Sequence, residues 1–437
     1  MSASVETLLA GDGGPPEVPG FAAALRRQGR EAFAREGLPT AGLEDWRFTS
    51  VSPLAAHDFA PGGAGAGVDR AEIERRAGPA GGPRLVFVNG RLRPDLSAPG
   101  APSEGVFVGG LARALAERPA LAEPHLGRLQ GLAGQPFAAW NTAFLEDGAL
   151  VHLAPGASAG APVELVFATV ARGAGAFAHP RVLFVGGRDS EATLVETYVA
   201  LGGAPALTSA VTEVVLEDGA RLDHYQVQDQ PADAYHFAAV AARQGRGARL
   251  STHSTALGAA LSRSDVRVAL EGEGAEAHVT GLYMADGARL VDNHSVVEHR
   301  ARGGTSRELF KGVLDGASRG VWAGRIRVLE GAMKTDAHQM SSSLLLSRDA
   351  TVDAMPQLEI YADDVKCGHG GTVGQLDADA LFYLRSRGIS HERARGLLIY
   401  AFARDMVDRV RPAALRQRLG RMVAARLPDG DLVLEAA

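Results

Sequence analysis

The chain has 437 residues and a mass of 45.5 kDa, and with 46% hydrophobic residues it can bury a large core across two or three domains. Its net charge of −6 gives no support for nucleic acid as the main partner. The single cysteine excludes an intrachain disulfide, and there is neither a secretory leader nor an apolar run of about 18 residues, so we expect a cytoplasmic protein outside the membrane.

Residues 1–140 predict a mixed, mostly helical N-terminal domain. The segment 21–36 has apolar residues near helical spacing with arginines on the other face. The segment RLVFVNGRL, at 84–92, predicts two short strands joined at Asn89 and Gly90, a strong hairpin signal. Residues 111–132 again predict helix.

Residues 141–365 predict a core made of strands. Short β-branched segments such as VELVFATV and AVTEVVL are separated by Gly and Asp turns. Turn glycines recur at spacings of 28, 27 and 29 residues, between Gly219, Gly247 and Gly274 and between Gly287 and Gly316. No helical pattern of ten residues interrupts them, which excludes alternating β-α-β units. The period favours a β-solenoid, with a β-sandwich as the alternative.

A solenoid has unpaired strand edges at its ends, which natural proteins cap or pair with a partner. The helical flanks can act as caps here. The flat faces remain available for a second solenoid to lie against.

Residues 366–437 predict a C-terminal helical domain. We expect a short helix over 377–387, a second after the N-cap Ser390 that ends at Pro412, and a third over 413–427. Arginines dominate the polar faces of these helices. Such a run of charge is usually a solvated face and is otherwise a docking surface.

The only cysteine lies in a motif with metal-binding chemistry. Cys367 and His369 are two residues apart, so on an extended backbone a thiolate and an imidazole, donors suited to iron or zinc, share one face. Asp363 would share that face if the strand continued unbroken, and it is a weaker candidate as an auxiliary ligand for iron. On spacing alone the motif is more often a structural turn, and Asp363 a solvated edge acid. Two ligands do not fill a site, so further ones must come from carboxylates or another polypeptide.

Other histidines give weaker signals. His294 and His299 are five apart and lack the helical i, i+4 spacing of an H-E-x-x-H zinc site, and His338 stands alone. No Walker A loop, dinucleotide fingerprint or nucleophile elbow is present. If ATP is used, another subunit binds it.

Four longer segments carry a family resemblance. LEIYADDVKCGHGGTVGQLD, LFYLRSRGIS, FKGVLDGASRGVWAGRIRV and KTDAHQMSSSLLLS resemble the SufB/SufD family, scaffold proteins of the Suf iron–sulfur cluster assembly system. The KC-x-HG pattern is similar to the SufD branch in particular. The resemblance implies a right-handed parallel β-helix over 141–365 that pairs with a SufB-like scaffold. It also implies a SufC-like ATPase, which binds the ATP, on the C-terminal helices.

The resemblance further implies a transient iron–sulfur cluster shared with the partner. Cys367 and His369, with Asp363 as a weaker third ligand, would hold iron or a nascent cluster at the subunit interface. We therefore expect a non-catalytic scaffold subunit. The alternatives are a self-pairing homodimeric scaffold and a β-solenoid hydrolase or transferase, which would need paired acids in a cleft.

Overall fold

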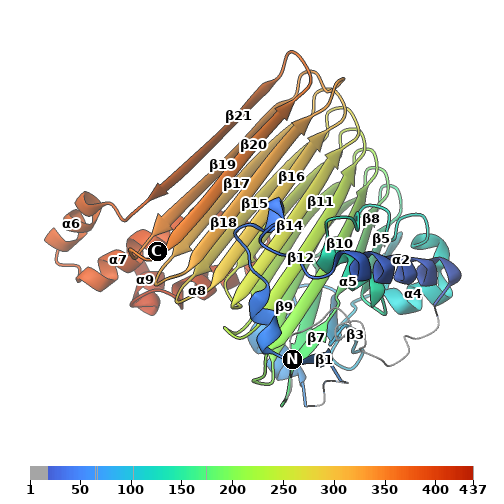
Figure 1. Ribbon diagram of the computed structural model, residues 1–437, viewed down its shortest axis with the longest axis horizontal. Helices are drawn as coiled ribbons and strands as arrows, with labels where there is room; N and C mark the ends of the chain where they lie inside the picture. The colour runs from blue at the N-terminus through green and yellow to red at the C-terminus, as the bar shows by residue number, and fades with distance from the viewer. Residues whose placement is uncertain (1–17, 64, 66, 102, 174, 437) are drawn as a thin grey trace.

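The structure, a computed structural model, describes residues 18–436 apart from 64, 66, 102 and 174. Two mainly parallel sheets lie face to face and form an elongated solenoid with helices on its flanks (Figure 1). The expectation of a mainly β fold with a solenoid core is confirmed. No helix in the described part of the chain is long and apolar enough to cross a membrane.

Strands alternate between the two sheets. Sheet A contains β1 (Phe59–Pro61), β4 (Val106–Gly110), β5 (Ala149–Leu153), β7 (Gly175–Ala178), β8 (Arg181–Gly186), β10 (Ala206–Leu216), β12 (Tyr235–Gln244), β14 (Leu261–Leu270), β16 (Leu290–His299), β18 (Arg319–Val328) and β20 (Thr351–Ile360). Sheet B contains β2 (Arg84–Val88), β3 (Arg91–Leu92), β6 (Val163–Val170), β9 (Glu191–Leu201), β11 (Arg221–Asp229), β13 (Arg249–Ala256), β15 (Glu276–Ala285), β17 (Thr305–Leu314), β19 (Asp336–Leu345) and β21 (Lys366–Gly374).

From β8 onward, each strand pairs in parallel with the strand two places later in the chain. One strand of each sheet therefore makes one coil. This parallel pairing excludes the sandwich alternative, whose sheets are antiparallel.

The repeated glycines make the turns between coils. Gly219, Gly247 and Gly274 have φ of 71°, 62° and 68°, a left-handed conformation that glycine adopts without a steric penalty. Their N–H groups donate to backbone carbonyls of the next turn at 2.8, 2.9 and 3.0 Å. The 27- to 29-residue period of the sequence is thus the length of one coil.

The interior of the solenoid is apolar with polar inclusions. Phe184, Phe310 and Trp322 are buried between the sheets. Glu196 is also buried there, and it accepts hydrogen bonds from Thr212 (2.9 Å) and from Gln226 (3.0 Å). Burial alone would raise the pKa of Glu196, but the nearby His224 imidazole and the hydrogen bonds from His224, Tyr198 and Gln226 hold it below its usual value.

The N-terminal helices cover mainly the outer face of sheet A, whereas the helix that contains Ile73 and Ala77 packs against sheet B. They are α2 (Gly20–Glu36), α3 (Arg70–Ala77), α4 (Leu111–Glu117) and α5 (Pro136–Ala143), with 3-10 turns at Glu44–Trp46, Ser52–Ala56 and Pro119–Leu121. Trp140 of α5 packs in an aromatic cluster with Phe33 of α2 and with Phe177 of sheet A. The predicted helix over 111–132 is wrong in length, because Pro119 disfavours helical geometry at Arg118.

The predicted hairpin at 84–92 is confirmed. β2 and β3 pair antiparallel, and Asn89 and Gly90 between them have φ of 51° and 83°. Asn89 also donates a side-chain hydrogen bond to the carbonyl of Gly63 at 2.8 Å.

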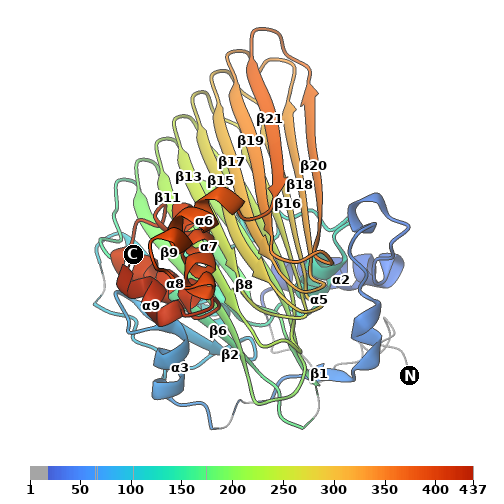
Figure 2. The same cartoon turned by 90° about the vertical axis from the view of Figure 1, so that its left-hand side faces the viewer.

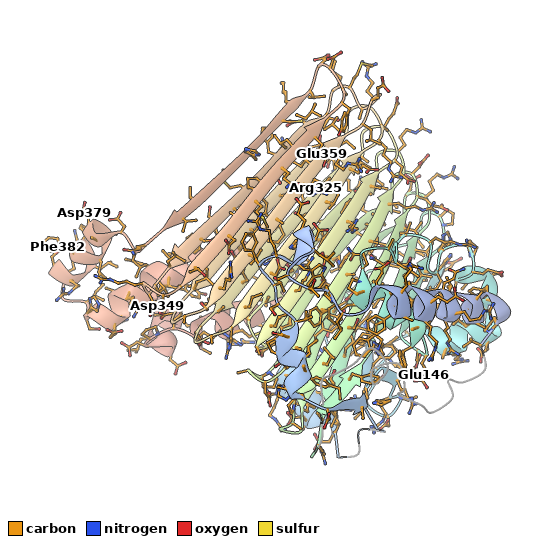
Figure 3. All side chains as sticks on the ribbon, viewed as in Figure 1. Glu146, Arg325, Asp349, Glu359, Asp379 and Phe382 are labelled. Carbon is orange, nitrogen blue, oxygen red and sulfur yellow. The ribbon has the colours of Figure 1, made fainter. Side chains whose placement is uncertain are left out.

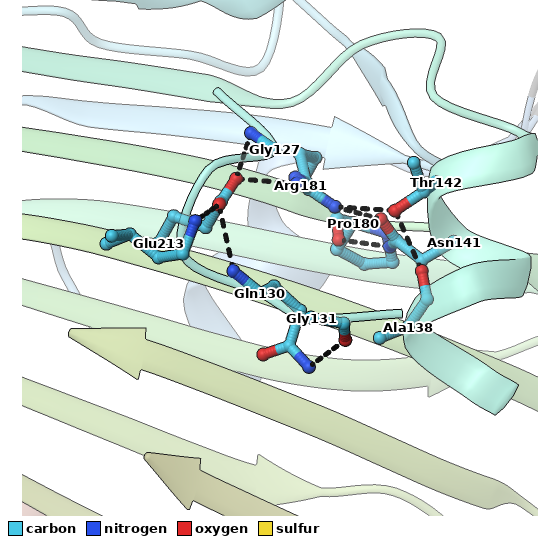
Figure 4. A network of polar contacts seen from close by, with 10 residues as sticks. Gly127, Gln130, Gly131, Ala138, Asn141, Thr142, Pro180, Arg181 and Glu213 are labelled. Carbon is cyan, nitrogen blue, oxygen red and sulfur yellow. Dashed lines mark hydrogen bonds and ion pairs between the residues drawn. The ribbon is translucent and has the colours of Figure 1, made fainter. Parts of the chain in front are cut away.

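A buried ion pair fixes the N-terminal helices to the solenoid (Figure 4). Arg181 of β8 donates to Glu213 of β10 at 2.6 Å, and both side chains are almost fully buried. Arg181 also donates to the side-chain oxygens of Asn141 (3.1 Å) and Thr142 (3.2 Å) on α5. Glu213 accepts three backbone N–H groups from the loop before α5, those of Gly127, Leu129 and Gln130.

The C-terminal helices from residue 391 onward cover the outer face of sheet B, whereas the first C-terminal helix has no buried residue (Figure 2). The C-terminal helices are α6 (Ala378–Ser386), α7 (His391–Val407), α8 (Ala413–Ala424) and α9 (Gly430–Ala436). Ser390 caps α7 by accepting the N–H of Arg393 at 3.3 Å, as predicted. Three arginines of the C-terminal part form ion pairs with the solenoid: Arg395 of α7 with Asp315, and Arg411 and Arg426, in the turns after α7 and α8, with Asp223 and Asp229. Part of the expected arginine face therefore attaches the helices to sheet B.

Candidate functional site

The Cys-x-His motif lies on the last strand of sheet B, β21. In the described part of the chain β21 hydrogen-bonds to β19 alone, and its register places Cys367 beside Ala337 and His369 beside Gln339. The motif is therefore on a regular strand, and its two side chains point to the same face, as the spacing predicts.

That face is the interior of the solenoid at its last coil. Ala337 and Gln339, the cross-strand neighbours, are both buried, and Cys367 packs against the cluster around Ile326 and Val328. Cys367 is half-buried and His369 is exposed, because no further coil covers β21 (Figure 1). Burial raises the pKa of the Cys367 thiol, opposed in part by its hydrogen bond with the backbone of Ala337.

Asp363 lies apart from this strand, in the turn between β20 and β21. β20 ends at Ile360 in sheet A and β21 begins at Lys366 in sheet B, so the unbroken strand that would place Asp363 beside the motif does not exist. Asp364, with φ of 55°, pairs with Lys334. Among the residues that the structure describes, no three His, Cys, Asp or Glu side chains gather as a metal site. Cys367 and His369 are therefore two candidate ligands, and the described residues bring no third such side chain beside them.

The last coil has two free strand edges. Successive N–H groups of a strand point to opposite sides, and the N–H of Lys366 points toward β19 and bonds to the carbonyl of Thr335. The N–H groups of Cys367, His369, Gly371 and Val373 therefore point toward the open edge. On β20, the N–H groups of Thr351 and Tyr361 bond to β18, which places Pro356 at an edge-facing position. Proline lacks an N–H there, so the edge of β20 is blunted while the edge of β21 is fully available for pairing.

Two family models match this chain. The model for the SufBD protein N-terminal region matches residues 18–165, and the model for the SUF system FeS cluster assembly SufBD core domain matches residues 168–402. The chain belongs to the SufBD family. As a SufBD family protein it takes part in iron–sulfur cluster assembly.

Two curated relatives align with about nine tenths of this SufBD protein, and a third with about half of it. An iron–sulfur cluster assembly SufBD family protein of Synechocystis is 33% identical over 399 residues, which are 89% of this chain and 87% of the relative. The iron–sulfur cluster assembly protein SufD of Escherichia coli is 30% identical over 406 residues, 92% of this chain and 93% of that protein. The chloroplastic protein ABCI7 of Arabidopsis thaliana is 33% identical over 233 residues, 53% of this chain and 49% of ABCI7.

The other candidate histidines do not come together in this SufBD chain. His294 points outward and pairs with Asp292 at 3.0 Å, whereas His299 points inward and hydrogen-bonds to Ser306 at 2.9 Å. His338 lies on the outer face of β19 beside Asp336, at 3.1 Å. Strand alternation separates these residues, so they do not form a shared metal site.

Sequence reasoning missed the residues beneath the motif. Gln339 lies next to His369 in register, and Glu308 lies next to Gln339, so both line the interior behind the open end. Gln339 precedes His369 by 30 residues and Glu308 precedes Gln339 by 31, slightly more than the period of the turn glycines. Projecting His369 back by the glycine period of 27 to 29 residues reaches neither Gln339 nor Glu308, so only the register of the strands identifies them.

The helix α6 presents exposed aromatic side chains beyond the end of β21. Phe382 is 72% exposed and Tyr383 is 55% exposed, and no residue of α6 is buried. Figure 3 shows Phe382 and Asp379 at the outer end of the molecule. This patch, Phe382 with Tyr383, is an apolar surface on the C-terminal helices of the SufBD fold.

Proposed function

We propose that this chain is a non-catalytic, SufD-type scaffold subunit that holds iron or a nascent iron–sulfur cluster at the open end of its solenoid. The observation that carries the proposal is the placement of Cys367 and His369 on the inward face of a terminal coil that no other coil covers. A thiolate and an imidazole are suitable iron ligands, and the remaining ligands come from a partner chain. A site with few ligands from each chain releases its cluster readily.

The partner in this proposal is a SufB-like solenoid that pairs with β21. Four edge-facing N–H groups on β21 favour pairing there, whereas Pro356 disfavours pairing on β20. Asp363 lies in the exposed turn next to this edge and is a candidate auxiliary ligand for incoming iron, since carboxylate oxygen is a hard donor.

A second candidate is a self-pairing scaffold. The same edge fits a second copy of this chain. Two copies meeting at their open ends would supply two thiolates and two imidazoles, which is a complete four-ligand set. The two candidates differ only in the partner.

The C-terminal helices are the proposed docking surface for a SufC-like ATPase, which would bind the ATP. The exposed pair Phe382 and Tyr383 supports this assignment, because aromatic side chains are enriched at protein interfaces. ATP-driven motion of the ATPase would then change the contact between the two scaffolds. We place the complex in the cytoplasm.

The test is reconstitution of the complex. The chain is co-expressed with the SufB-like and SufC-like proteins of its own source, and cluster formation is measured by absorbance after anaerobic addition of iron and sulfide. Cys367→Ala/His369→Ala is expected to keep the complex and lose most of the cluster absorbance. The matched control is His338→Ala, an outward-facing histidine on the neighbouring strand, which should leave assembly unchanged. Equal assembly by the double variant would remove both residues from the mechanism.

The partner edge has its own test. Val373→Pro removes an edge-facing N–H without breaking a bond to β19, and Val373→Ala keeps that N–H while shortening the side chain. Co-purification with the SufB-like protein should be lost in the proline variant and kept in the alanine variant. Retention of the partner by both would show that β21 is not the pairing strand, and elution of the chain alone as a dimer would favour the self-pairing scaffold.

A further inference from the structure

A line of polar side chains leads from the open end into the solenoid. The registers of β15, β17, β19 and β21 align Val279, Glu308, Gln339 and His369 on four successive strands of sheet B. All four occupy the inward-facing positions of their strands. Neighbouring strands are about 4.8 Å apart, so the backbones at Glu308 and His369 are about 10 Å apart.

The inner part of this line is buried and short of hydrogen bonds. Glu308 and Gln339 are each 2% exposed. Within the described residues, neither carboxyl oxygen of Glu308 has a hydrogen-bond partner at good geometry, and neither does the amide oxygen of Gln339. Gln339 does donate its amide N–H to the carbonyl of Gln357 at 3.0 Å. An unpaired buried carboxylate is costly, so the structure favours the protonated acid.

The opposite sheet closes the space around Glu308. Ser295 of β16 faces Glu308, and Gly324 of β18 lies so close to Gln339 that a Cβ at this glycine would be 2.3 Å from the amide oxygen. Behind them, Val266 and Val279 are buried and end the polar line. The line is therefore open only toward Cys367 and His369.

No charged group in the described residues acts on Glu308. The neighbouring strands contribute Val279, Gln339, Ser295 and Gly324, and the buried titratable side chains that share the interior of these coils are the neutral His299 and Tyr283. Asp292 of β16 and Arg263 of β14 are also buried, but they face outward and pair with each other at 2.8 Å. Burial raises the pKa of Glu308 to about 7, and the Ser295 hydroxyl opposes this only in part. At neutral pH this carboxyl therefore needs little free energy to change its charge.

We propose that Glu308 is a charge-compensating residue of the open-end site, protonated while the site is empty and ionised when a divalent cation binds at Cys367 and His369. On ionisation the carboxyl O–H bond breaks, the electron pair stays on the carboxylate and the proton passes to solvent. The Cys367 thiol loses its proton to solvent in the same event. This inference rests on the proposed role of Cys367 and His369.

The expected size of the effect follows from the distance. A unit charge and a divalent cation about 10 Å apart attract each other appreciably at an effective dielectric constant of about 20. Solvent at the open end screens part of this attraction, which leaves an expected effect of about tenfold on cation affinity. By linkage, bound cation and ionised Glu308 favour each other equally.

The experiment measures proton release on binding of Co²⁺ to the purified full-length chain. Co²⁺ gives a thiolate absorption band that reports ligation by Cys367, and a pH indicator in weak buffer counts released protons. Glu308→Gln keeps the shape of the side chain but cannot ionise. The matched control is Glu359→Gln, which changes an outward-facing carboxylate at the same end of the solenoid (Figure 3).

The wild-type chain and the Glu359→Gln control should release about half a proton more per Co²⁺ than Glu308→Gln at about pH 6.5, because a tenfold coupling moves the titration of Glu308 by about one pH unit, and the same number at about pH 9. Glu308→Gln should also bind Co²⁺ about tenfold more weakly at about pH 8. Equal proton release with Co²⁺ binding intact would overturn the inference and leave the proposed function standing. Absence of the thiolate band in the wild-type chain, alone and in complex with its partners, would overturn both.

A second measurement, made without metal, tests the protonation of Glu308 in the wild-type chain and does not depend on how well the variant folds. The infrared carbonyl band of a protonated carboxylic acid should be present at about pH 5, disappear with a midpoint near the pH where Glu308 titrates, and be missing in Glu308→Gln. A wild-type chain without such a titrating band would overturn the inference.

Discussion

The ion pair that joins the N-terminal helices to the solenoid gives a prediction with a calculable size. Arg181→Met leaves Glu213 fully buried, with its three backbone N–H partners but without its cation. Removing one partner of a buried pair costs about 3–5 kcal/mol. The three remaining hydrogen bonds stabilise the carboxylate, so we expect a loss of about 3 kcal/mol.

Second substitutions separate charge from hydrogen bonding. Arg181→Met/Glu213→Gln leaves no buried charge and keeps one oxygen, which can accept the N–H groups of Leu129 and Gln130 but not that of Gly127, so it should recover about 1 kcal/mol. Arg181→Met/Glu213→Met leaves three buried N–H groups without an acceptor and should recover nothing. Arg113→Met is the control, because Arg113 and Glu117 form an exposed pair, 76% and 54% accessible, whose loss should cost at most about 0.5 kcal/mol.

The assay is urea unfolding followed by tryptophan fluorescence, which is sensitive at this junction because Trp46 and Trp140 both pack there. The reasoning would be refuted if Arg181→Met lost less than about 1 kcal/mol, or if the double variant with methionine were as stable as the one with glutamine.

Three further predictions concern buried groups. Burial lowers the pKa of four histidines to about 3 or 4, namely His179, His236, His253 and His299. The unfolded chain therefore binds more protons than the folded chain below about pH 6.5, and the free energy of unfolding should fall by roughly 1.4 kcal/mol per pH unit for each histidine as the pH drops toward about 4. Thermal midpoints measured across this pH range test the prediction. Burial raises the pKa of Glu308 above its unfolded value, so its ionisation destabilises the fold as the pH rises through about 4.5 to 7. Glu308→Gln should therefore be more stable than wild type by up to about 3 kcal/mol at about pH 8 and equally stable at about pH 4. A stability difference that does not change with pH would contradict this. Gly324→Ala places a methyl group 2.3 Å from Gln339 and 2.4 Å from the Trp322 ring, so the free energy of unfolding measured by chemical denaturation should fall by about 1–3 kcal/mol. Gly374→Ala is the control, because its methyl group meets no atom within 4 Å and stability should not change.

Features that depend on local backbone geometry were correctly predicted. Gly219, Gly247 and Gly274 occupy left-handed turns one coil apart, and the Asn89-Gly90 hairpin forms as expected. The division of the chain into N-terminal, solenoid and C-terminal parts stays a prediction, and β21, from Lys366 to Gly374, continues sheet B beyond residue 365.

The candidate site was predicted in its residues but not in its surroundings. The shared face of Cys367 and His369 follows from a period of two residues, which any strand has. The expectation for Asp363 depended on an unbroken strand, and the turn after Ile360 removes that condition. The roles of Cys367, His369 and Asp363 in holding iron stay predictions until the complex is reconstituted.

The amino-acid sequence by itself favoured the β-solenoid over a sandwich and determined its coil length and the pair of donor side chains, because turn glycines and strand alternation act over a few residues. Only the tertiary structure decided that this pair faces the interior, that no coil covers it, and that Gln339 and Glu308 lie behind it. Those facts depend on the register between strands about 30 residues apart and on where stacking stops, which are set by pairing and packing of distant segments.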